Sequence, residues 1–228
     1  MKPLTKIAET SLPGGKSLEL WERDASFFLL EDGMQVASSF SHGSEDMAAE
    51  LAAAPVRRAN QPVFLIEGLG LGFFLSGAMN CVGREKASFI VAEPCNDLIA
   101  WNETFLDSLH PGMIQDPRVS VEGMKALDYA RRHSKALHAI LIKSTHARYD
   151  LTIGEASDYF GALKQGGLLV IIVSRHDDRL SKNLQKAGFE VAEEPVPSAH
   201  KGKKTNFNSV IIAKKGRFVP FSARQANS

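Results

Sequence analysis

Three closely spaced glycines form the part of this sequence best suited to hold a ligand against the backbone. Gly68, Gly70 and Gly72 follow Glu67 at the end of a short apolar run and precede a helix-length stretch. Glycine adopts positive φ at little cost and carries no Cβ, so the backbone can approach a ligand closely. The first turn of a following helix also offers unpaired N–H groups. The spacing predicts a ligand-binding turn, and the alternative is a tight strand–helix connection without a ligand.

A glutamate at the end of the next apolar run strengthens the ligand hypothesis. Glu93 lies 21 residues beyond Gly72, about where nucleotide-binding α/β folds place a carboxylate that accepts from ribose hydroxyls. A dinucleotide loop would require its third glycine at position 73, which is Phe73. The two features together predict a nucleoside-containing ligand without a pyrophosphate, such as S-adenosylmethionine, and disfavour NAD.

The elements that must position these residues are short apolar runs alternating with longer amphipathic stretches. Continuous β-branched runs indicate strands buried on both faces, and helix-length crossovers between them indicate a parallel α/β sheet. A polar segment without a helix separates the last two strands, so we expect them to pair antiparallel. The five buried runs are 63–66, 88–92, 119–121, 138–142 and 168–173, and the terminal hairpin comprises 189–193 and 209–214.

The residues before this sheet have a different pattern. After a polar lead ending at Gly15, three short strands joined by tight turns predict a small β-meander, and a helix with Ser44 as N-cap is expected to follow. We therefore expect a meander over 1–43, an α/β domain over 44–217 and a tail over 218–228.

Composition excludes several classes of protein. The 228 residues are 44% hydrophobic and 23% charged with a net charge of +1, which is typical of a folded globular protein with no global basic field for nucleic acid or membrane. Two cysteines, Cys81 and Cys95, are too few for a four-cysteine zinc site, and we predict no metal. No run is long enough to span a membrane. We expect a cytoplasmic protein that acts on a small molecule, with no membrane or nucleic-acid partner, and a homodimer as its candidate assembly.

Three segments resemble the spermidine/spermine synthase family. They are the glycine stretch 63–72, the strand end and helix start 91–102 with Trp101-Asn102, and the Asp-Pro-Arg-Val element within 116–123. The resemblance extends over roughly positions 18 to 192. It implies a seven-stranded, mostly parallel Rossmann-like sheet of the class I S-adenosylmethionine-dependent methyltransferase type. It also implies S-adenosylmethionine or its decarboxylated form as donor, bound by Glu67, Gly68, Gly70, Gly72, Glu93, Gly123 and Met124.

The sequence departs from that family at the positions where the family binds its donor and activates its amine acceptor. Leucines occupy the gaps of the glycine loop, and Met124 stands where the family places an aspartate that reaches the adenine amine. After the fourth strand, Lys143-Ser144-Thr145 replaces the aspartate that binds and deprotonates the attacking amine. A polyamine is almost wholly protonated at neutral pH, and Lys143 would repel it. We therefore predict that this protein is not an efficient spermidine synthase.

The remaining candidates for catalysis lie at the carboxyl edge of the sheet. His146 and Asp150 follow the fourth strand, where one of them could act as a base, although the same residues also fit a solvated loop. Glu45 lies where the meander meets the core. A sulfonium donor carries its own leaving group, so an alkyl transferase needs chiefly to orient donor and acceptor. The sequence favours a spermidine-synthase-like transferase with an unknown acceptor. The alternatives are a non-catalytic nucleoside-binding or interaction module on the same fold and a methyltransferase.

Overall fold

A four-stranded antiparallel sheet and a seven-stranded mixed sheet form the protein. The computed structural model describes residues 3–57, 59–83, 86–144, 149–198 and 207–216. The small sheet has the order β1-β2-β3-β4, and its strands are β1 Thr5–Ser11, β2 Ser17–Arg23, β3 Ser26–Glu31 and β4 Met34–Ser38. The polar lead predicted before the meander is wrong at β1, which pairs antiparallel with β2 as an edge strand. The predicted tail, 218–228, lies outside the described residues.

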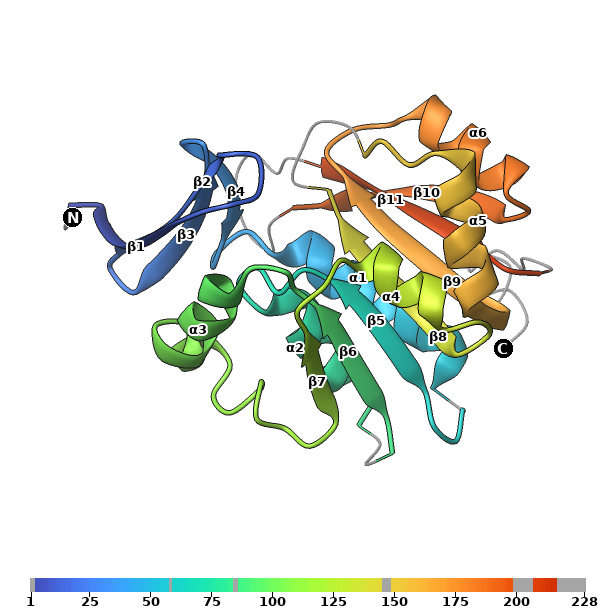
Figure 1. Ribbon diagram of the computed structural model, residues 1–228, viewed down its shortest axis with the longest axis horizontal. Coiled ribbons are helices and arrows are strands. Elements are labelled where there is room, and N and C mark those ends of the chain that lie inside the picture. Colours follow the sequence, from blue (N-terminus) through green and yellow to red (C-terminus); the bar gives the residue numbers. More distant parts are fainter. Residues whose placement is uncertain (1–2, 58, 84–85, 145–148, 199–206, 217–228) are drawn as a thin grey trace.

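The large sheet has the strand order β10-β11-β9-β8-β5-β6-β7 (Figure 1). Its parallel strands are β5 Val63–Glu67, β6 Ser88–Ala92, β7 Val119–Glu122, β8 Leu137–Lys143 and β9 Leu163–Val173. The last two strands, β10 Glu190–Pro197 and β11 Phe207–Lys214, pair antiparallel, and β11 joins β9 antiparallel. This confirms the predicted α/β fold with a terminal hairpin and a preceding β-sheet.

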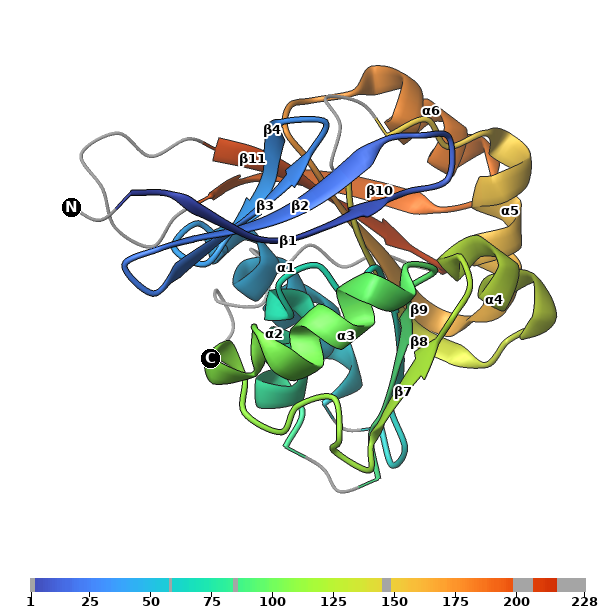
Figure 2. The ribbon, with the colours of Figure 1, turned by 60° about the vertical axis from the view of Figure 1, so that its left-hand side comes forward.

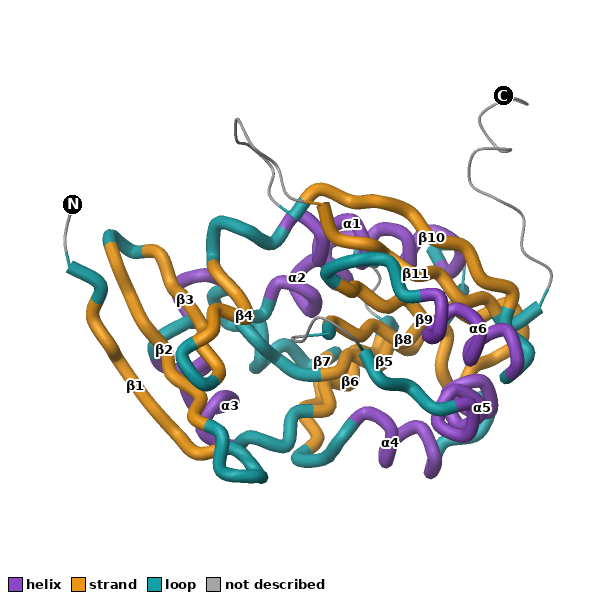
Figure 3. Tube along the Cα trace, turned by 90° about the horizontal axis from the view of Figure 1, so that it is seen from above, coloured by secondary structure: helices purple, strands orange, loops and turns teal. Residues whose placement is uncertain are grey.

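Two layers of helices cover the large sheet because its strands are apolar on both faces. The helices are α1 Gly43–Ala53, α2 Phe73–Cys81, α3 Asn96–Thr104, α4 Ala126–Arg132, α5 Ile153–Ala162 and α6 Asp178–Lys186, with short 3-10 turns at Ala54–Val56 and Asp107–Leu109. The α1 and α2 helices pack on one face and α4, α5 and α6 on the other, as Figure 3 shows from above. No helix in the described ranges is long and apolar enough to cross a membrane.

The small sheet packs on α3 and on the glycine loop. Leu20 and Phe27 of its inner face belong to one hydrophobic cluster with Leu98 and Trp101 of α3 and Leu71 of the loop. Figure 2 shows α3 beside the four strands. Trp101, which is 7% exposed, seats this helix against the small sheet. The small sheet therefore forms one wall beside the carboxyl edge of the large sheet.

The start of α1 differs from the expected serine cap. His42 is the N-cap residue and makes no side-chain cap bond, while Ser44 lies inside the helix. The Ser44 hydroxyl donates to Glu45 at 2.7 Å and accepts from the Asn208 side chain of β11 at 3.0 Å. A tertiary contact has replaced the local cap, so the sequence signal was correct for the helix and wrong for the role of the serine.

Candidate functional site

The glycine loop connects β5 to α2 at the centre of the carboxyl edge. Gly68, Gly70 and Gly72 all have positive φ, at 76°, 52° and 84°, which an L residue adopts only with strain. The leucines between them, Leu69 and Leu71, are buried at 4% and 3% exposure in two different core clusters. The leucines therefore anchor the loop while the glycines turn it, which explains why apolar residues fill the gaps.

Glu93 follows β6 and fixes this loop to the neighbouring strand. One carboxylate oxygen accepts the Leu69 N–H at 2.9 Å, and the other accepts the Cys95 N–H at 2.8 Å. Burial raises the pKa of the Glu93 carboxyl, and the two backbone N–H groups oppose that shift. Each oxygen keeps a further lone pair, so the carboxylate can accept from a ligand while it holds the loop in place.

Asn102 of α3 holds the same loop from the other side. Its side-chain amide donates to the Gly70 carbonyl and to the Leu98 carbonyl, each at 2.9 Å. The contact with Gly70 joins residues that are 32 positions apart in the chain. No local pattern reveals such a contact, so the loop-positioning role was missed.

Glu67 ends β5 beside the loop and accepts a hydrogen bond from the Tyr149 hydroxyl at 2.8 Å. Burial raises the pKa of Glu67 most strongly, while the Tyr149 hydrogen bond and the positive charge of Lys125 lower it in part. Burial and the neighbouring Glu67 charge raise the pKa of the Tyr149 phenol. Tyr149 therefore stays protonated at neutral pH and orients the Glu67 carboxyl group.

An ion pair joins α1 to the end of β8. Lys143 Nζ lies 2.5 Å from Glu45 Oε1, and the Ser44 hydroxyl donates to the other Glu45 oxygen. Glu45 is only 6% exposed, and its residue number differs from that of Lys143 by 98. The lysine that replaces the expected acid thus neutralises one of the candidate catalytic carboxylates.

These groups surround a cavity of about 600 Å³ between the small sheet and the carboxyl edge, which is within the usual range for small-molecule sites. It lies beside the point where the strand order reverses between β5 and β8, where open α/β sheets bind their ligands. Glu45, Glu67, Gly68, Gly70 and Glu93 line it together.

The other predicted site residues lie elsewhere. Gly72 is the N-cap of α2. Gly123 and Met124 follow β7 but are not among the described lining residues, whereas the next two residues, Lys125 and Ala126, are. Asp150 is exposed and pairs with Arg179 at 3.3 Å, a placement that gives no support to a role as base. His146 lies outside the described residues.

The chemistry of the cavity suits a polar ligand with an apolar part. Four carboxylates and three lysines line it in the described chain, and the lining also includes leucines and Phe73. The Phe73 ring is stacked on the His42 imidazole, with 3.8 Å between the ring centroids. Acids held by backbone N–H groups and by lysines keep fixed orientations, which is what a site needs to align two reactants.

Comparison with solved structures shows what fold this is. Spermidine synthase from Thermotoga maritima matches with a TM-score of 0.75 and 18% identity over 98% of this chain and 79% of that chain. A spermidine synthase in complex with the transition state analogue AdoDATO matches with a TM-score of 0.74 and 18% identity, over 98% and 78%. A methyltransferase from Geobacter sulfurreducens matches with a TM-score of 0.53 and 14% identity, over 74% and 78%.

Sequence comparison finds no family model and no curated protein that matches the chain. The structural matches alone show that the protein has the fold of spermidine synthases and of Rossmann-like methyltransferases.

Proposed function

We propose that this protein is a transferase that uses an adenosyl-sulfonium donor and an acceptor other than a polyamine. The donor is S-adenosylmethionine or its decarboxylated form, and the group moved is methyl or aminopropyl. The observation that carries the proposal is the Glu93 carboxylate, which is buried at the cavity wall and hydrogen-bonded to the Leu69 N–H of the glycine loop. That arrangement brings together a carboxylate that can accept from ribose hydroxyls and a glycine loop whose backbone a ligand can approach closely.

The chain's own residues supply orientation and charge. Glu93 would accept from the ribose hydroxyls, and the glycine loop would bring the backbone of Gly68 and Gly70 against the donor. Glu67, held by Tyr149, lies on the β5 side of the cavity, where it can bind a polar group of the donor tail. A sulfonium donor carries its own leaving group, so alignment of donor and acceptor is the main requirement.

The ion pair between Lys143 and Glu45 supports an acceptor that is not a polyamine. A protonated polyamine needs unpaired carboxylates, and here the Glu45 carboxylate is neutralised by Lys143 at the cavity wall. The same observation favours a second candidate, a non-catalytic nucleoside-binding module, because neutralising a potential base also removes a means of activating an acceptor.

Calorimetric titration with S-adenosylmethionine, its decarboxylated form, methylthioadenosine and NAD tests the proposal. We expect saturable binding of one or more adenosyl compounds and none of NAD. Binding to the folded state also raises its stability, by about 2.7 kcal/mol at a hundredfold excess over Kd. Binding of NAD without any adenosyl compound would refute the donor assignment. Binding without transfer to any acceptor in a small-molecule screen would favour the module.

Substitution of Glu93 locates the donor. A hydrogen bond to a charged group contributes about 1.5 to 3 kcal/mol, so Glu93→Gln and Glu93→Ala should weaken donor binding about tenfold to a hundredfold. Glu93→Ala should also lower the free energy of unfolding by about 1 to 3 kcal/mol, because the Leu69 and Cys95 N–H groups lose their acceptor.

Glu122→Gln is the matched control for these variants. Glu122 ends the neighbouring strand β7, accepts from the Ser120 hydroxyl and does not line the cavity in the described chain. We expect its donor affinity to equal that of the parent protein. Unchanged affinity in both Glu93 variants would remove this carboxylate from the site.

A further inference from the structure

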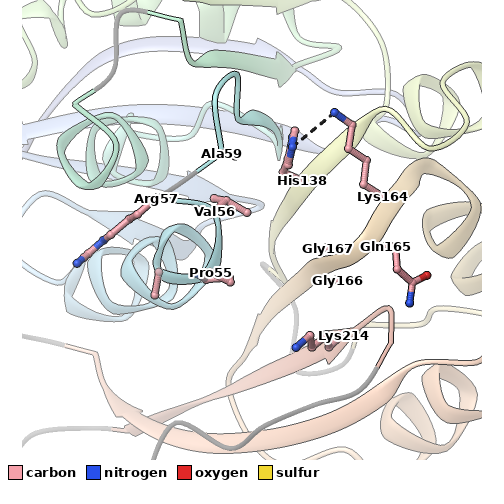
Figure 4. Close-up of a pocket in the computed structure, with 11 residues that line it drawn as sticks. Pro55, Val56, Arg57, Ala59, His138, Lys164, Gln165, Gly166, Gly167 and Lys214 are labelled. Carbon is pink, nitrogen blue, oxygen red and sulfur yellow. Dashed lines mark hydrogen bonds between the residues drawn. The ribbon is translucent and has the colours of Figure 1, made fainter. Parts of the chain in front are cut away.

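A second cavity, of about 740 Å³, opens at the amino-terminal edge of the same sheet. Figure 4 shows its lining, which comes from the segment after α1 and from the ends of β8, β9 and β11. His138 is the second residue of β8 and lies here, whereas Lys143 ends the same strand at the first cavity. The two cavities therefore lie at opposite edges of the sheet.

A bulge in β9 builds one wall of this cavity. Leu137 and Ala139 of β8 pair with Leu163 and Leu168 of β9, so three extra residues of β9 loop out between the paired positions. Gly166 turns the bulge with a φ of 78°. A Cβ at Gly167 would lie 2.9 Å from the Lys164 carbonyl, so only glycine fits this approach. Bulges of this kind re-aim side chains.

The end of β11 fixes the bulge in place. The Gly166 N–H donates to the Lys215 carbonyl at 2.6 Å, and the Lys215 N–H donates to the Gly167 carbonyl at 3.0 Å. The Lys215 ammonium group is itself held by the Phe160 and Leu163 carbonyls. These hydrogen bonds hold the bulge in one conformation, in which the Lys164 side chain points at the imidazole of His138 (Figure 4).

Two hydrogen-bond donors face each other at this point. His138 Nδ1 accepts the Val63 N–H at 3.0 Å, so the proton of the neutral imidazole is on Nε2. Lys164 Nζ lies 3.5 Å from that Nε2, and an ammonium group has no acceptor site. Neither group can therefore accept a hydrogen bond from the other. An oxygen atom placed between them would accept from both.

The charge around this pair is predominantly positive. Lys214 and Arg57 also line the cavity, and no carboxylate does so in the described part of the chain. Glu190 is the cross-strand partner of Lys214, and Arg57 lies 3.8 Å from Glu50 and extends away from His138 in Figure 4. Burial, and next the positive charge of Lys164, lower the pKa of His138.

We propose that the cavity lined by His138, Lys164 and Lys214 binds a small phosphorylated molecule, with one phosphate oxygen bridging His138 Nε2 and Lys164 Nζ. A phosphate group offers several acceptor oxygens, which the converging donors and Lys214 require. The opposite wall of Pro55, Val56 and Ala59 is apolar and contacts the organic part of the ligand. This site is independent of the adenosyl donor and its acceptor.

Titration with inorganic pyrophosphate, followed by calorimetry and by the imidazole resonances of His138, tests the proposal. We expect saturable binding, a shift of the His138 signals and a rise in the pKa of His138, because the bound anion favours the imidazolium form. Lys164→Gln should weaken pyrophosphate binding about tenfold to a hundredfold, since it removes a charged hydrogen bond. It should also raise the pKa of His138 in the ligand-free protein, since a positive neighbour is lost.

Lys182→Gln is the matched control. Lys182 is an exposed lysine of α6 that lines neither cavity, so we expect its pyrophosphate affinity to be that of the parent protein. Three outcomes would overturn the proposal: no saturable binding, equal weakening in both variants, or displacement of pyrophosphate by an adenosyl compound that binds at the carboxyl edge. Pyrophosphate binding with no adenosyl binding would leave this site intact and refute only the transferase.

Discussion

The two edges of the parallel sheet carry cavities of similar volume, but the side chains that line them differ in charge. The carboxyl-edge cavity is lined in the described chain by both acids and bases, Glu31, Glu45, Glu67, Glu93, Lys16, Lys125 and Lys143. The amino-edge cavity is lined by Arg57, Lys164, Lys214 and His138, without a carboxylate among the described lining residues. One strand, β8, contributes His138 to one cavity and Lys143 to the other, roughly 17 Å apart along an extended chain.

The difference follows from how each edge satisfies its polar groups. At the carboxyl edge, crossover loops run into helices and offer backbone N–H groups, so Glu93 is held by Leu69 and Cys95, and Lys143 is held by Glu45. At the amino edge, His138 and Lys164 are both donors. A paired edge selects ligands by fit and orientation, whereas an edge with unmatched donors selects an anion.

Alanine at a left-handed glycine should show the largest difference between the edges. Gly72, at φ 84°, leaves a Cβ only 2.7 Å from Met113 Cε and 2.8 Å from His110 Cδ2. Gly166, at φ 78°, has open space around its Cβ position. Backbone strain costs about 1 to 2 kcal/mol at either site, and overpacking adds about 1 to 3 kcal/mol at Gly72 alone. Denaturant unfolding should therefore show a loss of about 2 to 5 kcal/mol for Gly72→Ala and about 1 to 2 kcal/mol for Gly166→Ala.

Equal losses in these two variants would contradict the comparison, because they would mean that Met113 and His110 move aside at no cost. A larger loss for Gly166→Ala would indicate instead that the bulge of the amino edge is the more constrained structure.

Removal of Lys143 should change which acceptors the carboxyl edge tolerates. We expect the parent protein, given putrescine and the decarboxylated donor, to form little or no spermidine. Lys143→Gln frees the Glu45 carboxylate, and an attraction of about 1 kcal/mol or more between close opposite charges should strengthen putrescine binding about fivefold or more. Calorimetry measures this gain. Lys125→Gln is the control, because Lys125 lines the same cavity at its β7 side.

Two results would contradict this prediction. Turnover of the parent protein near the typical enzyme median of about 10 per second would show that the Lys143–Glu45 pair does not exclude polyamines. An equal gain in the two lysine variants would show that only the net charge of the cavity matters.

Much of the fold could be predicted because its signals are local. The buried runs of β5, β6 and β8 are continuous and apolar, and they are found within a residue or two of their structural bounds. The edge strand β1 was missed because its residues are mostly exposed and polar. The sequence does not reveal the bulge of β9, because Lys164 to Gly167 break the apolar run and the pattern predicts a strand that starts at Leu168.

The site divides along the same line. The sequence places Glu93, Gly68 and Gly70 together at the cavity, because strand end, loop and helix are consecutive in the chain. The sequence does not predict the pairing of Glu45 with Lys143, because residues so far apart meet only through the packing of α1 on the sheet. The contact between Asn102 and the Gly70 carbonyl and the donor pair at His138 likewise depend on tertiary structure.

The smallest expected effect concerns the ion pair between Asp116 and Arg118 at the amino edge, which stabilises the fold and lines neither cavity in the described chain. Arg118 donates to both oxygens of Asp116 just before β7, at 2.9 and 2.8 Å. Hydrogen bonds from the Arg118 side chain and N–H lower the pKa of Asp116 from its ordinary 3.8 to about 2. Because the folded-state pKa is the lower one, the pair stabilises the fold above the unfolded-state value, and this stabilisation is lost as the pH falls through about 2.

Asp116→Asn should therefore destabilise the protein at pH 7 and not at pH 2. Water reaches both side chains, which are 22% and 23% exposed, so we expect a loss of about 1 kcal/mol or less at neutral pH. Thermal unfolding of the parent protein and the variant at the two pH values measures it. Asp128→Asn is the control, since Asp128 lies 3.5 Å from Arg131 on an exposed helix face and should show little change at either pH. A deficit for Asp116→Asn that persists at pH 2 would mean that the side chain acts through packing of the turn before β7 and not through its charge.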